Sequence, residues 1–113
     1  MLVLPHRDFT FDRNRPVTNF AHLLQDYYTK TGEDDLTHLE EILELHDLCI
    51  DILAGTKEQF KKRSLDNYAN RCLHHHVYDF KLLEDMFDFL NINVIKQEFM
   101  RPNHQIIIGK KSV

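Results

Sequence analysis

Glycine and proline are scarce in this chain. Only three glycines and three prolines occur among 113 residues, whereas hydrophobic residues make up 42% of the sequence and charged residues 28%. This composition excludes collagen-like and disordered chains and predicts a globular protein rich in helix. The length is that of one ordinary domain, so we expect residues 1–113 to form a single domain.

Cysteines are few, and a long hydrophobic run is lacking. Cys49 and Cys72 form no CxxC motif, and the single bridge they could make is not a disulfide framework. We therefore expect two reduced thiols and a cytoplasmic location. The apolar residues that follow Met1 are too few for a signal peptide, and no stretch approaches the ~20 apolar residues that a membrane span needs.

An excess of positive charge is also lacking. Lysine and arginine number 14 against 18 acidic residues, which gives a formal net charge of -4 and a pI near 6.0. Such a chain does not attract phosphate groups, which argues against nucleic acid and anionic membranes as partners. The short basic run at residues 61–63 is interpreted as a solvated helix face.

Four segments carry apolar residues at the spacing of an amphipathic helix, and residues that commonly begin or end helices bound them. We expect three or four helices. The predicted segments run from Thr18 to Gly32, from Asp34 or Asp35 to Gly55, from a Thr56/Gln59 capping box to about Cys72, and from Asp79 to Asn91.

Three runs favour strands instead. Leu2–Leu4, ended by Pro5, fits a short strand that is buried on both faces. Residues 92–99 and 104–110 flank a turn that contains proline and asparagine, which predicts an antiparallel hairpin. The second arm has the apolar character of an interior strand, whereas the first resembles an edge strand. The predicted fold is therefore α/β, with a small three-stranded sheet that ends in an antiparallel hairpin.

Two longer peptides resemble a known family. Residues 2–18 read LVLPHRDFTFDRNRPVT, and residues 71–95 read RCLHHHVYDFKLLEDMFDFLNINVI. They are similar to the fifth strand with its substrate-side loop, and to the lead-in to the last helix and sixth strand, in one bacterial subgroup of the S-adenosylmethionine-dependent methyltransferases of the Rossmann-like class. In that family the final strand inserts antiparallel between the fifth and the sixth. The resemblance thus implies that Ile106–Ile108 lies beside Leu2–Leu4.

The resemblance covers only the C-terminal half of such an enzyme. The family holds its cofactor with a glycine-rich turn after the first strand and an acidic residue at the end of the second. Glycines at positions 32, 55 and 109 cannot build that turn. We therefore expect no cofactor for this chain alone, and S-adenosylmethionine only when a partner completes it. The open edge of the first strand predicts a homo-oligomer or a partner protein there.

Three consecutive histidines at residues 74–76 admit several interpretations, because imidazole serves as metal ligand, proton carrier or hydrogen-bonding group. If the segment is extended, Cys72, His74 and His76 point to one side. A His-x-His pair can begin a zinc site, which needs about four ligands. The remaining ligands would come from Cys72, His6 or Asp12.

The resemblance implies a catalytic interpretation, because the lead-in to the last helix lies beside the substrate pocket in that family. His74 or His76 would then orient an acceptor hydroxyl or take its proton, and His6 is the third predicted catalytic residue. The predicted substrate-binding residues are Asp12, Arg13, Arg15 and His75. In a third interpretation the imidazoles only bond the backbone of the loop at residues 6–18.

Other polar residues also admit both a functional and a structural interpretation. Arg13 and Arg15 could clamp a phosphate or carboxylate, or they could pair structurally with acids such as Glu33, Asp34 and Asp35. His46 falls on an apolar helix face and is interpreted as a core histidine bonded to a neighbour. His38 and Glu41 are interpreted as a surface pair.

The sequence is compatible with three functions. The first is the substrate-side portion of a methyltransferase that is inactive alone, the second is a non-catalytic protein-interaction module, and the third is a histidine-rich zinc-binding domain.

Overall fold

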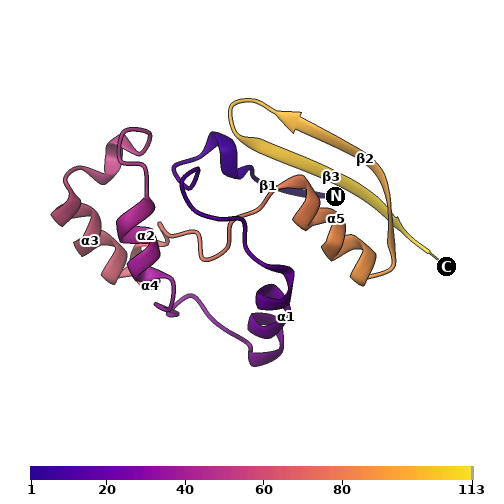
Figure 1. Cartoon of the computed structure of the whole chain (residues 1–113), viewed down its shortest axis with the longest axis horizontal. Coiled ribbons are helices and arrows are strands. Elements are labelled where there is room, and N and C mark those ends of the chain that lie inside the picture. The colour runs from indigo at the N-terminus through magenta and orange to yellow at the C-terminus, as the bar shows by residue number, and fades with distance from the viewer. Residues whose placement is uncertain (113) are drawn as a thin grey trace.

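The computed structural model describes residues 1–112 and places a small open sheet at one side of the molecule (Figure 1). The strands are β1 (Leu2–Pro5), β2 (Ile92–Met100) and β3 (His104–Lys111), in the order β1-β3-β2. Both pairings are antiparallel, and Leu2 lies opposite Ile107. The predicted hairpin and the predicted neighbourhood of the first and last strands are confirmed.

Helix α5 (Phe80–Phe89) covers one face of this sheet. Leu83 and Phe87 of the helix pack with Ile107 of the central strand, and all three are buried. Leu2, Leu4 and Ile92 add apolar surface to this first hydrophobic cluster. The sheet and α5 therefore form one packed layer pair.

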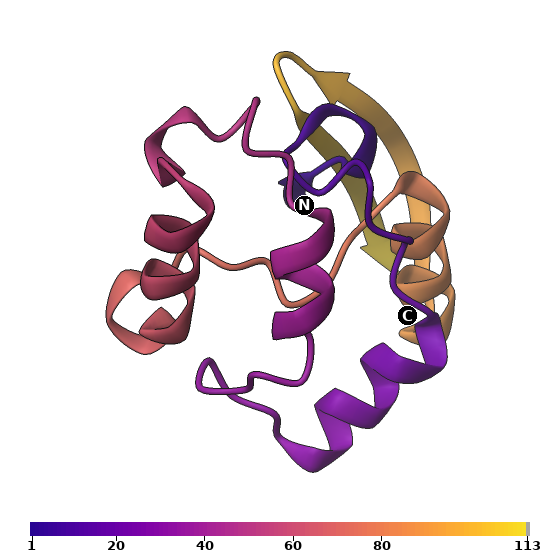
Figure 2. The same ribbon diagram turned by 60° about the vertical axis from the view of Figure 1, so that its left-hand side comes forward.

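The other face of the sheet and the β1 edge are open. Val3, which points away from the face that carries Leu2 and Leu4, is 38% exposed, and β1 pairs with no strand other than β3 in the described residues. The prediction that the first strand is buried on both faces is therefore wrong. Among residues 1–112, no helix covers that side (Figures 1 and 2).

A second group of helices lies apart from the sheet (Figure 1). It contains α2 (Leu39–Leu45), α3 (Lys57–Leu65) and the single turn α4 (Asn67–Asn70). Its hydrophobic cluster consists of Ile42, Ala54 and Phe60, with Leu43, Leu48 and Leu73 packed against them. The described residues thus contain two small apolar clusters rather than one.

Helix α1 (Phe20–Thr29) packs against α5, where the rings of Phe20 and Phe89 lie 5.8 Å apart (Figure 2). Asn19 caps it by accepting from the backbone N–H of Ala21, and Lys30 ends it in the left-handed conformation. The predicted cap, Thr18, instead accepts from the backbone N–H of Val77. A contact with a distant segment therefore moves the start of the helix by one residue.

The long helix predicted for residues 34–55 does not form. Thr37 donates to the Asp35 carboxylate with both its N–H and its hydroxyl, a local turn that competes with helix. After α2, the backbone N–H of Asp47 donates to the Phe11 carbonyl, at 2.8 Å, instead of continuing the helical ladder. Only α2 and the 3₁₀ turn Ile52–Ala54 remain, and the described residues hold five α-helices rather than three or four.

Other local predictions are confirmed. Thr56 and Gln59 form a reciprocal capping box at the start of α3. Asp79 caps α5 by accepting from the backbone N–H of Leu82, and Asn91 is left-handed after that helix. Cys49 and Cys72 are unpaired. Among residues 1–112, no helix has both the length and the apolar character that crossing a membrane requires.

Candidate functional site

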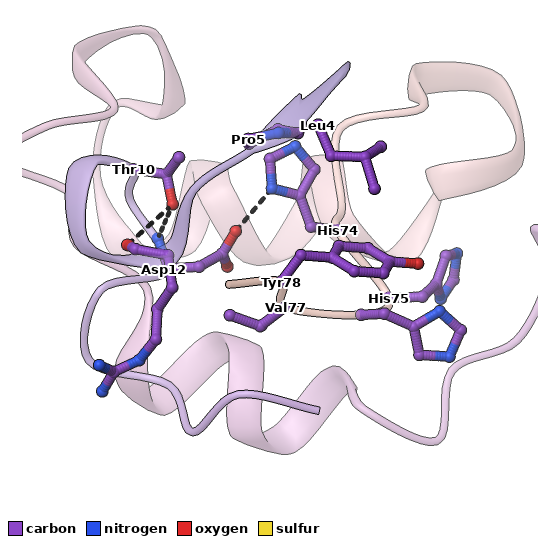
Figure 3. A pocket seen from close by; sticks show the side chains of 10 residues that line it. Leu4, Pro5, Thr10, Asp12, His74, His75, Val77 and Tyr78 are labelled. Atoms are coloured by element: carbon purple, nitrogen blue, oxygen red, sulfur yellow. Dashed lines mark hydrogen bonds and ion pairs between the residues drawn. The ribbon is translucent and has the colours of Figure 1, made fainter. Parts of the chain in front are cut away.

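Two connecting segments lie side by side between the two hydrophobic clusters. In the loop of residues 6–18, the backbone N–H groups of Arg7 and Thr18 donate to the carbonyls of Tyr78 and Val77, both at 2.9 Å. A pocket of about 240 Å³ lies between this loop, which follows β1, and the segment of residues 71–79 (Figure 3). Four predicted site residues line it: Asp12, His74, His75 and His76.

The carboxylate of Asp12 joins two partners across this junction. Its Oδ2 lies 2.6 Å from Nδ1 of His74, and its Oδ1 accepts from Nη1 of Arg15 at 2.9 Å. Asp12 is 2% exposed and Arg15 is 1% exposed, so the ion pair is removed from water. Figure 3 shows the Asp12 carboxylate and the His74 ring pointing toward each other.

Arg15 directs its donors inward. Besides Asp12, its guanidinium donates to the backbone carbonyls of His74, at 2.7 Å, and His75, at 3.4 Å, and its Nε donates to Glu41. A buried guanidinium held by these acceptors fixes the path of the histidine segment. This placement favours the structural role of Arg15 over a clamp on a substrate.

The charges around Asp12 set its protonation. Burial opposes its ionisation, but the hydrogen bonds of His74 and Arg15 outweigh burial and hold the pKa of Asp12 below its ordinary value. An ionised Asp12 accepts the N–H at Nδ1 of His74, which leaves Nε2 as the basic nitrogen. Within residues 1–112, no side chain or backbone group hydrogen-bonds that nitrogen, and 35% of the His74 side chain is exposed.

His74 is therefore an imidazole oriented by a buried carboxylate, with a basic nitrogen that solvent or a ligand can reach. Its ring stacks on Phe11, with centroids 4.8 Å apart, which further fixes its orientation. Such a pair can accept a proton from a hydroxyl that enters the pocket. Burial also raises the pKa of Tyr78, which lines the same pocket and keeps its hydroxyl protonated.

The three consecutive histidines have three different partners. His74 contacts Asp12, Nε2 of His75 lies 3.5 Å from the Asn67 amide, and Nε2 of His76 lies 2.6 Å from the Asp26 carboxylate. The chain bends at His75 and His76, so the segment is not the extended run on which the shared face of Cys72, His74 and His76 depended. A His-x-His zinc pair does not form.

His6 and Arg13 lie outside the pocket lining. His6 accepts from the backbone N–H of Asp8, and its ring lies among those of Phe9, Phe80 and Phe99. Arg13 pairs with Asp47 at 2.6 Å. The acids that pair with the two arginines are thus Asp12, Glu41 and Asp47, and the predicted partners Glu33, Asp34 and Asp35 are wrong.

Two further histidines contrast with each other. His46 lies between the rings of Phe11 and Phe60 and is bonded to Asp51 at 2.9 Å, which confirms its interpretation as a core histidine. His38 was expected to pair with Glu41, which is wrong, since Nε2 of His38 lies 2.9 Å from Nε2 of His22.

Sequence reasoning missed the residues around His76. His22 and Asp26 are four residues apart on α1, and that spacing places both side chains on one face of a helix. The spacing was the available signal, but nothing in the sequence linked it to His38 or to His76.

The glycines do not fit an S-adenosylmethionine site of the family type. Gly32 lies in a turn after α1, Gly55 follows the turn Ile52–Ala54, and Gly109 lies on β3 against Phe87 and Ile92. None of them connects a strand to a following helix. Comparisons with protein-family models, with curated proteins and with solved structures gave no match. The interpretation of the site therefore depends on its own geometry.

Proposed function

We propose that the chain is the substrate-side portion of an S-adenosylmethionine-dependent methyltransferase. In this role His74, oriented by Asp12, takes the proton of an acceptor hydroxyl. The observation that carries the proposal is the 2.6 Å contact between the two side chains at the wall of a pocket. The strand order β1-β3-β2, with the last strand in the middle, supports it as well, because the resemblance of the sequence implies that order.

The proton transfer needs only groups that the chain provides. Nε2 of His74 forms a bond to the acceptor proton, and the acceptor oxygen retains the electron pair of the broken O–H bond. The ionised Asp12 stabilises the resulting imidazolium through Nδ1–H, while Arg15 keeps Asp12 ionised from its other side. General-base assistance of this kind contributes on the order of 10²- to 10⁴-fold to a rate.

The methyl donor has to be held by residues other than these 113. The open β1 edge and the uncovered sheet face are where a cofactor-binding half would add. A second copy of the chain adds no glycine-rich turn, so a homo-oligomer alone does not complete the site. The proposal thus requires a distinct partner segment that contains one.

Isothermal titration calorimetry tests the requirement for a partner. The purified chain is titrated with S-adenosylmethionine, first alone and then together with any polypeptide from a neighbouring gene that contains a glycine-rich first half. Cofactor binding only in the presence of that polypeptide supports the proposal. Absence of binding in both titrations overturns it and favours a non-catalytic interaction module.

The role of His74 is tested in the completed complex. His74→Gln and Asp12→Asn are expected to lower kcat for methyl transfer by about 10²-fold or more, with the cofactor affinity unchanged. His75→Gln is the comparison variant and should lower kcat less than either change, since His75 lines the same pocket but contacts Asn67 instead of Asp12. Equal losses in the three variants would show that the oriented imidazole is not the base.

A further inference from the structure

Four potential metal ligands converge on one point beside α1. Nε2 of His22 lies 2.9 Å from Nε2 of His38 and 3.2 Å from Oδ2 of Asp26, which in turn lies 2.6 Å from Nε2 of His76. One ligand atom from each of the four residues lies within 4.8 Å of the others. None of these residues belongs to the Asp12–His74 pair described above.

The backbone brings the four ligands together from three separate places. His22 and Asp26 project from one face of α1, one turn apart. His38 is the residue before α2, and His76 follows the bend in the histidine segment. The cluster therefore bridges α1, the start of α2 and the segment of residues 71–79 that connects α4 to α5.

The imidazole rings are arranged around the point rather than stacked. The ring centroids of His22 and His38 are 4.9 Å apart at an interplanar angle of 86°. His76 lies 5.8 Å from His22 and 6.1 Å from His38, each at 70°. Rings that are steeply inclined to one another can all direct a nitrogen at one ion, whereas a parallel stack cannot.

We propose that His22, Asp26, His38 and His76 form a tetrahedral Zn²⁺ site. Three imidazole nitrogens and one carboxylate oxygen suit zinc, whereas Mg²⁺ and Ca²⁺ prefer oxygen ligands. Ligand atoms in a tetrahedral zinc site are about 3.4 Å apart, given zinc–ligand distances of about 2.0–2.1 Å. The separations of 2.6 to 4.8 Å in the cluster bracket that value, so small side-chain rotations suffice to admit the ion.

The surroundings support exchange of the ion with solvent. All four residues are half-buried, and Asp26 and His76 also line a cavity of about 600 Å³ beside α1 and α5. The hydroxyl of Thr31 donates to the second oxygen of Asp26, which orients the carboxylate as an outer-shell partner does. A site of this kind ties α1 to the other elements, and its stabilisation of the folded state grows with the logarithm of the free zinc concentration once that concentration exceeds the Kd.

Metal analysis of the untagged 113-residue chain tests the site. We expect about one zinc per chain after dialysis against trace zinc, and Co²⁺ substituted for it should give the intense visible bands of tetrahedral coordination. A chain that holds no stoichiometric zinc, or whose Co²⁺ spectrum is that of the hexaaquo ion, overturns the proposal. Both measurements use the unmodified chain and do not depend on the stability of a variant.

Variants then identify the ligands. His22→Gln and Asp26→Asn are expected to weaken zinc binding by about tenfold or more, since even outer-shell changes cost about 10–100-fold. His75→Gln is the matched control, because it removes the histidine next to His76 without touching the cluster. His22 is the safest position to change, since 34% of its side chain is exposed. Equal affinity in all three variants overturns the assignment, as does an equal loss in the His75 variant.

A thermal readout separates binding from adventitious surface contact. Zinc should raise the Tm of the wild-type chain, the rise should grow with the logarithm of the zinc concentration, and a chelator should reverse it. The His22→Gln chain should show a smaller rise at each concentration. A rise of the same size in both chains contradicts the site. The result is independent of the proposed methyltransferase role, because neither His74 nor Asp12 is a ligand.

Discussion

Nδ1 of His74 lies 2.6 Å from Oδ2 of Asp12, although 62 residues separate the two in the sequence. The same aspartate is paired with Arg15, whose guanidinium also donates to the backbone carbonyl of His74. The three residues thus form a closed set of contacts between the loop of residues 6–18 and the histidine segment. A polar network, and not an apolar core, joins the two hydrophobic clusters at this point.

Removal of the Asp12 carboxylate should destabilise the fold strongly. Asp12→Ala leaves the guanidinium of Arg15 buried without its closest counter-ion, and breaking a buried pair in this way costs about 3–5 kcal/mol. We expect a decrease of about 3 kcal/mol in the free energy of unfolding, measured by urea denaturation.

Asp8→Ala is the control for that measurement. Asp8 is paired with Arg7 at 3.1 Å, but its side chain is 57% exposed, and exposed pairs contribute about 0–1 kcal/mol. If Asp12→Ala costs no more than Asp8→Ala, the buried network does not stabilise the junction.

The stability of the chain should fall as the pH is lowered through the range in which histidine titrates. Burial lowers the pKa of His46 below its ordinary value of 6.5, against the opposing effect of Asp51. The unfolded chain therefore takes up a proton at this residue at a higher pH than the folded chain does. Protonation below about pH 6.5 thus favours the unfolded state, and stability rises with pH over this interval.

His46→Phe tests the origin of that dependence. Phenylalanine retains an aromatic ring between Phe11 and Phe60, and Asp51 keeps its contact with Arg63 at 2.7 Å. The free energy of unfolding of the variant should change less between about pH 7.5 and 5.5 than that of the wild type. Identical slopes in urea denaturation series would assign the effect to other groups.

Gly109 should not tolerate a side chain. A Cβ at this position on β3 would lie 2.7 and 2.8 Å from ring carbons of Phe87, and it would also clash with Ile92. Overpacking of this kind costs about 1–3 kcal/mol, so Gly109→Ala should lower the free energy of unfolding by that amount. Gly32→Ala is the control, since its nearest atom is the end of the Asp34 side chain at 3.1 Å. Comparable stability of the two variants would show that α5 can shift away from the sheet.

The N-cap of α5 should contribute a measurable part of the stability. A carboxylate oxygen of Asp79 accepts from the backbone N–H of Leu82 at 2.8 Å. Asp79→Ala removes this acceptor and should cost about 1 kcal/mol, whereas Asp79→Asn keeps a capping oxygen and should lose only a fraction of that. Circular dichroism during thermal unfolding measures both, and equal losses would exclude the cap as the cause.

Local chemistry allowed parts of the fold to be predicted from the sequence. The capping box of Thr56 and Gln59, the cap at Asp79 and the left-handed Asn91 depend on residues within a few positions of one another. The apolar run at residues 106–108 also indicated the central strand, because a strand with neighbours on both sides carries more apolar residues than an edge strand.

The candidate site was predicted only in part. Asp12 and His74 were both named from the sequence. Their contact, however, depends on two segments that are far apart in the sequence and meet only in the folded chain. The inward orientation of Arg15 was not foreseeable either, because its acceptors are backbone carbonyls of the histidine segment. Periodicity carries no information about such acceptors.

The sequence by itself determined the start of α3, both ends of α5 and the hairpin of β2 and β3, because neighbouring side chains and backbone groups decide these features. The helix predicted to continue to about Cys72 instead ends at Leu65 and is followed by the separate turn α4. Tertiary structure alone decided where the predicted long helix ends, since the backbone N–H of Asp47 donates to Phe11 instead of to its own helix. It also decided that His22 and His38 meet beside His76, because the path of the backbone between α1 and α2 sets that distance and no local preference does.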